Sequence, residues 1–156
     1  MRAGDELTLS APFGDVVLDD ADTLLLVSAG IGCTPMVAML EYFAATGATR
    51  LVWVLHADRF PAEHALRTDT DRALGELPAA CSQFWYEQDA AAEPGARPGL
   101  INVTDLDLPA DADVYLCDSL PFMRAVRTQL LKAGIPARHI RYEVFGPDVC
   151  LAHVED

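Results

Sequence analysis

One short motif combines residue types that can bind a charged ligand. The hexapeptide Gly30-Ile31-Gly32-Cys33-Thr34-Pro35 follows the apolar run from Leu24 to Val27. Two glycines one residue apart allow a tight turn and a close approach of backbone to a ligand. Thr34 and Pro35 predict a helix start, with threonine as N-cap and proline at the first helical position. A strand, a glycine turn and a helix N-terminus in this order favour an anion site made of free backbone N–H groups.

The motif differs from the dinucleotide fingerprint G-x-G-x-x-G, because Pro35 occupies the third glycine position. The acidic residue that the fingerprint places about 20 residues further on is also missing, since Asp58 comes later than that. A bare G-x-G turn is often only structural. The helix start that follows it here favours phosphate binding.

Further candidate residues lie at the ends of later apolar runs or within them. They are His56 and Arg59, then Cys117 and Asp118, and finally Glu143. In an open parallel sheet the carboxyl ends of the strands meet at one edge, where ligands bind. Structural interpretations are also open. Cys117 could be a buried cysteine that acts as a small hydrophobe, and Glu143 could simply face solvent. His56 and Arg59 could be surface residues without a function.

The elements that would position these residues alternate between strand and helix. Strands are predicted over residues 24–27, 51–55, 83–87, 113–117 and 140–144, and helices over 35–46, 63–77 and 121–133. This order predicts an α/β fold with an open, doubly wound, parallel five-stranded sheet. If the first strand is central and the fourth lies beside it, Gly30–Gly32 and Cys117–Ser119 line the ligand crevice.

Before this sheet, residues 2 to 20 predict a β-hairpin with a turn at Ala11-Pro12-Phe13-Gly14. A lone hairpin is marginal in water, so it is expected to be the last piece of a β domain whose beginning lies outside this chain. The expected organisation is a hairpin over 1–22, an α/β domain over 23–150 and a tail over 151–156.

Composition restricts the class of partner. The net charge of −13 argues against nucleic acid and anionic membrane surfaces, because both are bound through Lys and Arg. The longest apolar run is too short to span a bilayer and the first residues lack a signal-peptide core, so a cytoplasmic protein is expected. A phosphate site must therefore be built locally, from backbone dipoles and an arginine.

Common catalytic and metal-binding patterns are missing from the sequence. The four cysteines lie far apart and the four histidines show no metal spacing, so free thiols and no metal are expected. Ser28 is not part of a G-x-S-x-G elbow, which disfavours hydrolase chemistry.

Several segments taken together resemble one family. They are residues 28–36, 52–59, 84–86, 115–117 with Phe122-Met123, and 142–147, in this order along the chain. They resemble the NAD(P)-binding domain of the ferredoxin–NADP reductase superfamily, closest to the reductase part of flavohaemoglobins. The predicted hairpin resembles the end of that family's FAD-binding barrel. Phenol hydroxylase and other oxygenase reductases share most of these motifs.

The resemblance implies a site for NADH, with NADPH as the alternative. Residues 30–34 would hold the pyrophosphate, His56 and Arg59 would lie on the adenosine side, and Cys117 would line the nicotinamide pocket. Glu143 matches an acidic residue near the nicotinamide–flavin junction, and Phe145 matches an aromatic residue beside the flavin. The implied reaction is hydride transfer to FAD, with electrons passing to a haem-globin of nitric oxide dioxygenase type or to an iron–sulfur protein.

The chain departs from the family pattern in two places. Asp118-Ser119 replaces the usual Gly-Pro, which is expected to weaken dinucleotide binding, and Phe60 follows Arg59 where asparagine is usual. The Arg-x-Tyr-Ser motif of the flavin half is not in this sequence, so the chain is expected to need an FAD-binding domain, in cis or in trans, and to be inactive alone. A degenerate domain with an interaction or regulatory role is the alternative.

The choice between NADH and NADPH stays open. Asp58 favours NADH, whereas Arg59 would suit the 2′-phosphate of NADPH.

Overall fold

The computed structural model describes residues 4–6, 8 and 16–142 of the chain. Its centre is one six-stranded sheet with the order β4-β3-β2-β1-β5-β6, in which every neighbouring pair is parallel. The elements are β1 (Thr23–Ala29), α1 (Cys33–Thr46), β2 (Leu51–Asp58), α2 (Arg67–Glu76), β3 (Ala80–Tyr86), β4 (Arg97–Pro98), β5 (Asp113–Cys117), α3 (Leu120–Lys132) and β6 (Ile140–Tyr142). Short 3₁₀ turns occupy Gly30–Gly32, Pro61–Glu63, Ala90–Ala92 and Ala137–His139.

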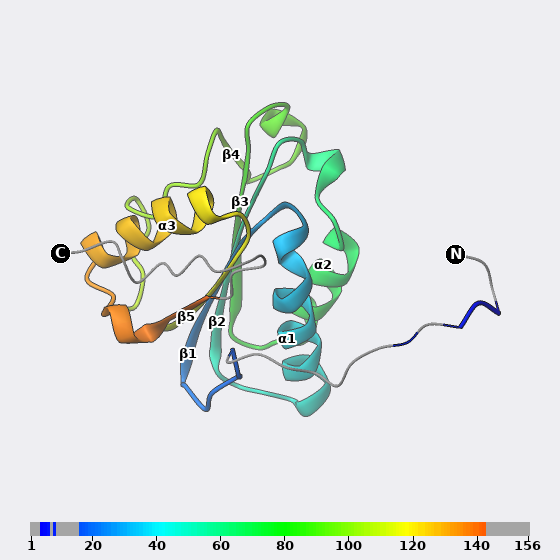
Figure 1. Cartoon of the computed structure of the whole chain (residues 1–156), viewed down its shortest axis with the longest axis horizontal. Coiled ribbons are helices and arrows are strands. Elements are labelled where there is room, and N and C mark those ends of the chain that lie inside the picture. Colours follow the sequence, from blue (N-terminus) through cyan, green and yellow to red (C-terminus); the bar gives the residue numbers. More distant parts are fainter. Residues whose placement is uncertain (1–3, 7, 9–15, 143–156) are drawn as a thin grey trace.

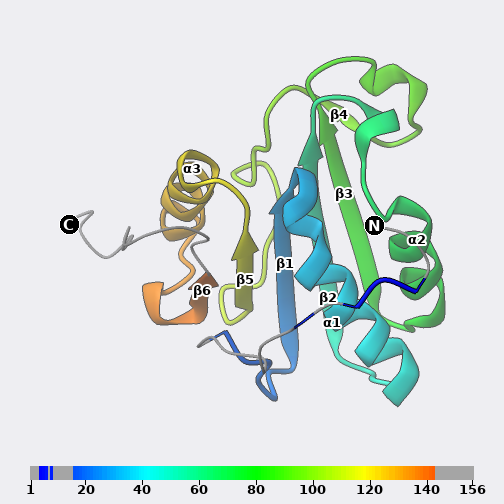
Figure 2. The same ribbon diagram turned by 45° about the vertical axis from the view of Figure 1, so that its right-hand side comes forward.

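Helices cover both faces of the sheet. Figures 1 and 2 show α1 and α2 on one face and α3 on the other. Strand β1 is central and apolar because it is buried from both sides: Leu24 and Leu26 pack towards α1, while Leu25 and Val27 pack towards α3. The α/β fold predicted from the sequence is confirmed.

The condition under which the sequence places the ligand crevice is met. Strand β5 pairs with β1, and Ser28 is in register with Cys117. The strand order therefore reverses at β1, with β2 on one side and β5 on the other. The strand that was not predicted is β4, two residues between the predicted strands 83–87 and 113–117. Two residues are too few to show any periodicity, so the sequence pattern missed this strand.

Two helix starts differ from the prediction. Helix α1 begins at Cys33, because the 3₁₀ turn of the glycine motif continues directly into it. The Thr34 hydroxyl donates to the carbonyl oxygen of Ile31 at 3.1 Å instead of capping the helix. Helix α2 begins at Arg67 rather than at Glu63, because Leu66 has a left-handed conformation with φ +56° and interrupts the helix.

The segment that leads into β1 is irregular. Residues 16–22 form no strand, so the described part of the expected hairpin lacks its returning strand, and the remaining hairpin residues lie outside the described part. This segment is nevertheless fixed to the sheet. The Tyr115 hydroxyl accepts from the Asp19 amide and donates to the Val17 carbonyl, each at 2.9 Å. Arg141 also forms an ion pair with Asp19.

No helix in the described residues combines the length and apolar character needed to cross a bilayer.

Candidate functional site

The carboxyl ends of β1, β2 and β5 meet at one edge of the sheet and enclose a cavity of about 550 Å³. Its other walls are the loop at residues 99–101 and the α3 residues from Pro121 to Gln129. This is the place where the strand order reverses, and ligands of open α/β sheets bind there. Gly30, Arg59 and Asp118 line the cavity, as do Asp58 and Glu87.

The two glycines of the motif face different surroundings. Gly30 has φ +46° and borders the cavity, where an added Cβ would meet nothing closer than Asp118 Oδ1 at 4.0 Å. A Cβ on Gly32 would lie 2.4 Å from the carbonyl oxygen of Cys117. Gly32 therefore lets the turn pack on the end of β5, and only Gly30 offers an open backbone approach to a ligand.

The other motif residues are divided between surface and core. Ile31 is 71% exposed and Thr34 is exposed, whereas Pro35 is half-buried. Cys33 is buried, its thiol donates to the Ala65 carbonyl oxygen at 3.3 Å, and burial raises the pKa of the thiol. A ligand at this turn would meet backbone and exposed side chains, but not the Cys33 sulfur.

Cys117 and Asp118 end β5 and point to different places. The Cys117 side chain is 4% exposed and belongs to the core on the α1 face of the sheet. Asp118 lines the cavity, and its Oδ2 accepts from the Ser119 hydroxyl at 3.0 Å. A contact between Cys117 and nicotinamide stays a prediction. Glu143 and Phe145, predicted for the flavin side of that ring, lie outside the described residues.

The charge around the cavity is mostly negative. Glu87 and Asp118 are acidic lining residues and Arg59 is the one arginine among them, whereas the Asp58 carboxylate has its Oδ2 buried opposite His56. Arg59 is exposed, and its guanidinium lies 5.2 Å from the ring centre of Phe60. Any phosphate bound here would rely on Arg59 and on backbone N–H groups.

His56 lies beneath this edge rather than on it. Its side chain is 1% exposed, so it offers almost no surface to a ligand, and its expected place on the adenosine side stays a prediction. The β1–β2 register pairs His56 with Ser28, and the Ser28 Oγ lies 2.9 Å from His56 Nδ1. On the other side of the ring, His56 Nε2 lies 3.6 Å from Asp58 Oδ2. Burial, together with the charge of Arg67, lowers the pKa of His56 to about 4.

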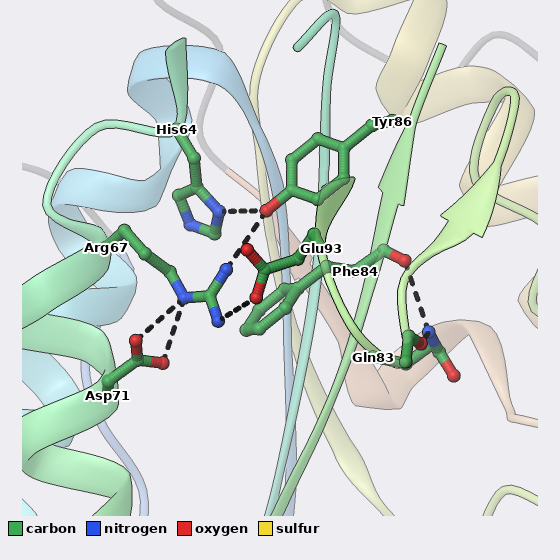
Figure 3. A network of polar contacts seen from close by, with 8 residues as sticks. His64, Arg67, Asp71, Gln83, Phe84, Tyr86 and Glu93 are labelled. Atoms are coloured by element: carbon green, nitrogen blue, oxygen red, sulfur yellow. Dashed lines mark hydrogen bonds and ion pairs between the residues drawn. The ribbon is translucent and has the colours of Figure 1, made fainter. Parts of the chain in front are cut away.

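A second histidine, missed by the sequence analysis, stacks on the first. The rings of His56 and His64 lie 3.9 Å apart, and His64 Nδ1 is 2.8 Å from the Tyr86 hydroxyl. Arg67 donates to the same hydroxyl at 3.2 Å and is held between Asp71 and Glu93 (Figure 3). The alternation of side chains along the strands places His56 and Tyr86 on the same face of the sheet. His64 comes from an irregular segment without any periodicity, so the sequence gives no signal that it joins them.

A family model described as "Oxidoreductase NAD-binding domain" matches residues 26–128, which is more than half of the chain. Among curated proteins, the flavohemoprotein of Rhizobium meliloti is 37% identical over 158 residues, and that of Chromobacterium violaceum is 39% identical over 155 residues. These alignments cover 96% and 94% of this chain, but only 39% and 38% of the relatives. The chain thus spans about two fifths of their length.

Solved structures give the same result. The flavohemoglobin of Malassezia yamatoensis, with bound FAD and haem, superposes with a TM-score of 0.79 at 37% identity, covering 86% of this chain and 36% of that one. The FAD/NAD-binding domain of nitric oxide dioxygenase from Vibrio cholerae gives a TM-score of 0.80 at 34% identity, covering 88% and 57%. The sequence-derived assignment to the ferredoxin reductase superfamily is confirmed. This chain belongs to the oxidoreductase NAD-binding domain family and is similar to the reductase part of flavohaemoglobins.

Proposed function

We propose that this chain is the NADH-binding part of a flavoprotein oxidoreductase. In the complete protein it would deliver hydride from NADH to FAD, and electrons would pass onward to a haem-globin of nitric oxide dioxygenase type or to an iron–sulfur acceptor. The single observation that carries the proposal is the cavity of about 550 Å³ at the β1–β5 reversal, bordered by the open backbone of Gly30. Its position matches the general ligand site of open α/β sheets.

The lining residues fit an adenosine diphosphate moiety. Apolar surface from Leu100 and Phe122 suits a base, while Arg59 and the backbone at Gly30 suit the phosphates. Nicotinamide would supply the hydride chemistry, and the protein's part is positioning. Cys117 and Glu143 are proposed to act near the nicotinamide ring. Phe145 is proposed to lie beside the flavin, which a separate FAD-binding domain would hold.

Saturation-transfer NMR of this chain with NADH tests the proposal. The Gly30→Leu variant should abolish the signal, because its side chain would enter the cavity. Gly47→Leu is the matched control, since Gly47 also has a left-handed conformation (φ +65°) but caps α1 away from this cavity. The wild-type residue Leu66 shows that leucine adopts this conformation in the same chain. A wild type without any NADH signal would contradict the proposal.

A second experiment tests the reaction itself. The chain is joined to the flavin domain of a related flavohaemoglobin, and bleaching of the flavin by NADH is followed in the absence of oxygen. Bleaching faster than that of the flavin domain alone is expected. Equal rates would limit the proposal to nucleotide binding.

Asp118 favours the alternative function, a domain that keeps the fold as an interaction or regulatory module. Its carboxylate borders the cavity beside Gly30 and would repel a pyrophosphate. If Asp118 only weakens binding, Asp118→Asn should raise NADH affinity about fivefold or more, because two like charges about 4 Å apart repel each other by about 1 kcal/mol even in bulk water. Calorimetric titration measures the change. If the wild type and Asp118→Asn both fail to bind NADH, the alternative is supported.

A further inference from the structure

One glutamine joins two walls of the cavity. Gln129 is the last α3 residue that lines the cavity, and another wall is the loop at residues 99–101. The Val103 amide donates to Gln129 Oε1 at 2.9 Å, and Gln129 Nε2 donates to the carbonyl oxygen of Ile101 at 3.4 Å. The stretch of chain that leaves β4 is therefore tied to α3 by a side chain (Figure 1).

The amide group of Gln129 suits both of these bonds. A backbone N–H donates and a backbone carbonyl oxygen accepts, so one side chain that binds both needs an acceptor and a donor close together. The amide supplies both. Ile101 and Val103 are buried, and an unpaired backbone group costs free energy in such surroundings. The loop is therefore expected to stay where Gln129 holds it.

The loop presents a leucine to the cavity from a fixed backbone. Leu100 is 73% exposed and lines the cavity. Just before it, the Gly99 amide donates at 2.8 Å to the carbonyl oxygen of Tyr86, at the end of β3. Leu100 therefore lies between two attached points, while Phe122 lines the same cavity from α3. The separation of these two apolar side chains depends on the bonds that Gln129 makes.

From this arrangement we infer that Gln129 is a positioning residue, which fixes the loop at residues 99–103 to α3 and so sets the width of the cavity for a flat base. The inference rests on the proposed nucleotide site, in which Leu100 and Phe122 contact the base. A wall that is already in place needs no ordering when the ligand binds. Without the two hydrogen bonds, part of the binding free energy would be lost in ordering the loop.

Gln129→Met keeps the length of the side chain and removes both hydrogen bonds. Calorimetric titration of this chain with 5′-AMP should show about fivefold weaker binding to the variant, because the net stabilisation of about one hydrogen bond is lost.

Gln83→Met is the matched control. The Gln83 amide also ties down a loop, since it donates to the carbonyl oxygen of Gly95 at 2.8 Å, but Gln83 does not line the cavity. This control should bind AMP as tightly as the wild type does. Thermal unfolding of both variants separates a loss of stability from a loss of affinity.

A second nucleotide isolates the contact with the base. AMP and CMP share the ribose 5′-phosphate, so the ratio of their dissociation constants reports on the base alone. The larger purine buries more apolar surface, and the wild type should prefer AMP about fivefold or more. Gln129→Met should lower this ratio at least about twofold, because the smaller base of CMP touches less of the wall and loses less when the wall moves.

Two further measurements test whether Gln129 acts through the loop. In Leu100→Ala the apolar wall is already reduced, so adding Gln129→Met should weaken AMP binding by less than about twofold further. In the wild type, AMP at about ten times its dissociation constant should slow exchange of the Val103 amide about tenfold, if this amide opens only when the loop leaves α3 and the open loop does not bind. Val103 does not line the cavity, so a direct contact with AMP would not explain this protection.

Unchanged AMP affinity in a folded Gln129→Met variant would overturn the inference, and so would an equal loss of affinity in Gln83→Met. An unchanged ratio of AMP to CMP affinity, or additive losses in the double variant, would show that Gln129 does not act through the loop. The exchange measurement uses the wild type alone, and a Val103 rate that AMP leaves unchanged would overturn the inference even if the variants do not fold. Failure of the wild type to bind AMP and NADH would instead contradict the proposed function, and this inference with it.

Discussion

At the scale of single residues, Gly30 and Gly32 differ in what their missing side chains permit. Gly32 is needed because the turn and the end of β5 touch through backbone atoms, and a Cβ would lie 2.4 Å from a carbonyl oxygen. Gly30 is needed for its positive φ and for the open space beside it. A residue pattern shows only that glycine is present at both positions.

Stability measurements distinguish the two glycines. Gly32→Ala should lower the free energy of unfolding by about 2–3 kcal/mol, because the added methyl group forces the turn away from β5. Gly30→Ala should lower it by about 1 kcal/mol, the strain of a left-handed alanine. Urea unfolding followed by tryptophan fluorescence measures both. Equal losses in the two variants would show that the contact between the turn and β5 does not hold the fold.

At the scale of elements, the stacked histidines join the end of β2 to the segment that precedes α2. Both rings are buried and uncharged, since burial lowers the pKa of His56 to about 4 and that of His64 to about 3. Arg67 adds to both shifts, and His56 further lowers the pKa of His64. Both side chains titrate near pH 6.5 when the chain is unfolded.

This difference predicts a loss of stability in acid. Below about pH 6.5 the unfolded chain binds protons that the folded chain excludes, so the free energy of unfolding falls as the pH falls. His56 alone should contribute a loss of about 3 kcal/mol by pH 4. Urea unfolding at pH 7, 5.5 and 4 measures it. His56→Gln cannot titrate there and should lose correspondingly less, whereas parallel curves for the two proteins would contradict the prediction.

Some elements of this fold can be predicted from the sequence pattern, and others cannot. Leu24 to Val27 and residues 114–117 are unbroken apolar runs, and their strands are predicted because burial on both faces requires such runs, whereas their pairing entered only as a condition. The start of α2 was not predicted, since the left-handed conformation of Leu66 has no signal in its residue type. For His56 the sequence offers a place on the adenosine side, by family resemblance, or a place on the surface, and it does not predict burial. Its burial depends on Ser28 and His64, which are distant in sequence.

At the scale of the whole molecule, the segment before β1 is fixed to the domain through side chains. Tyr115 binds two backbone groups of residues 17–19, and Arg50 and Arg141 pair with Asp20 and Asp19. These contacts hold residues 17–20 in one position against the sheet.

Tyr115→Phe tests this attachment. The variant keeps the buried ring but removes the hydroxyl, so the Asp19 amide should exchange with solvent about 5- to 13-fold faster, since a hydrogen bond is worth about 1–1.5 kcal/mol. Hydrogen exchange measured by NMR gives the rate. Amides in β2, far from Tyr115 along the sheet, serve as the internal reference. An unchanged Asp19 rate would show that the arginines alone hold the segment.

The pairing of β1 also has a consequence for folding. Paired residues of β1 and β2 are about 30 residues apart in the sequence, whereas those of β1 and β5 are about 90 apart. The cavity lies where these three strands end. Long loops close late, so we expect the β1–β2–β3 half to form in the transition state and β5 to dock afterwards. A nucleotide bound in the cavity would then slow unfolding and leave the folding rate unchanged. At 100 times its dissociation constant, NADH should lower the unfolding rate about 100-fold in a chevron experiment.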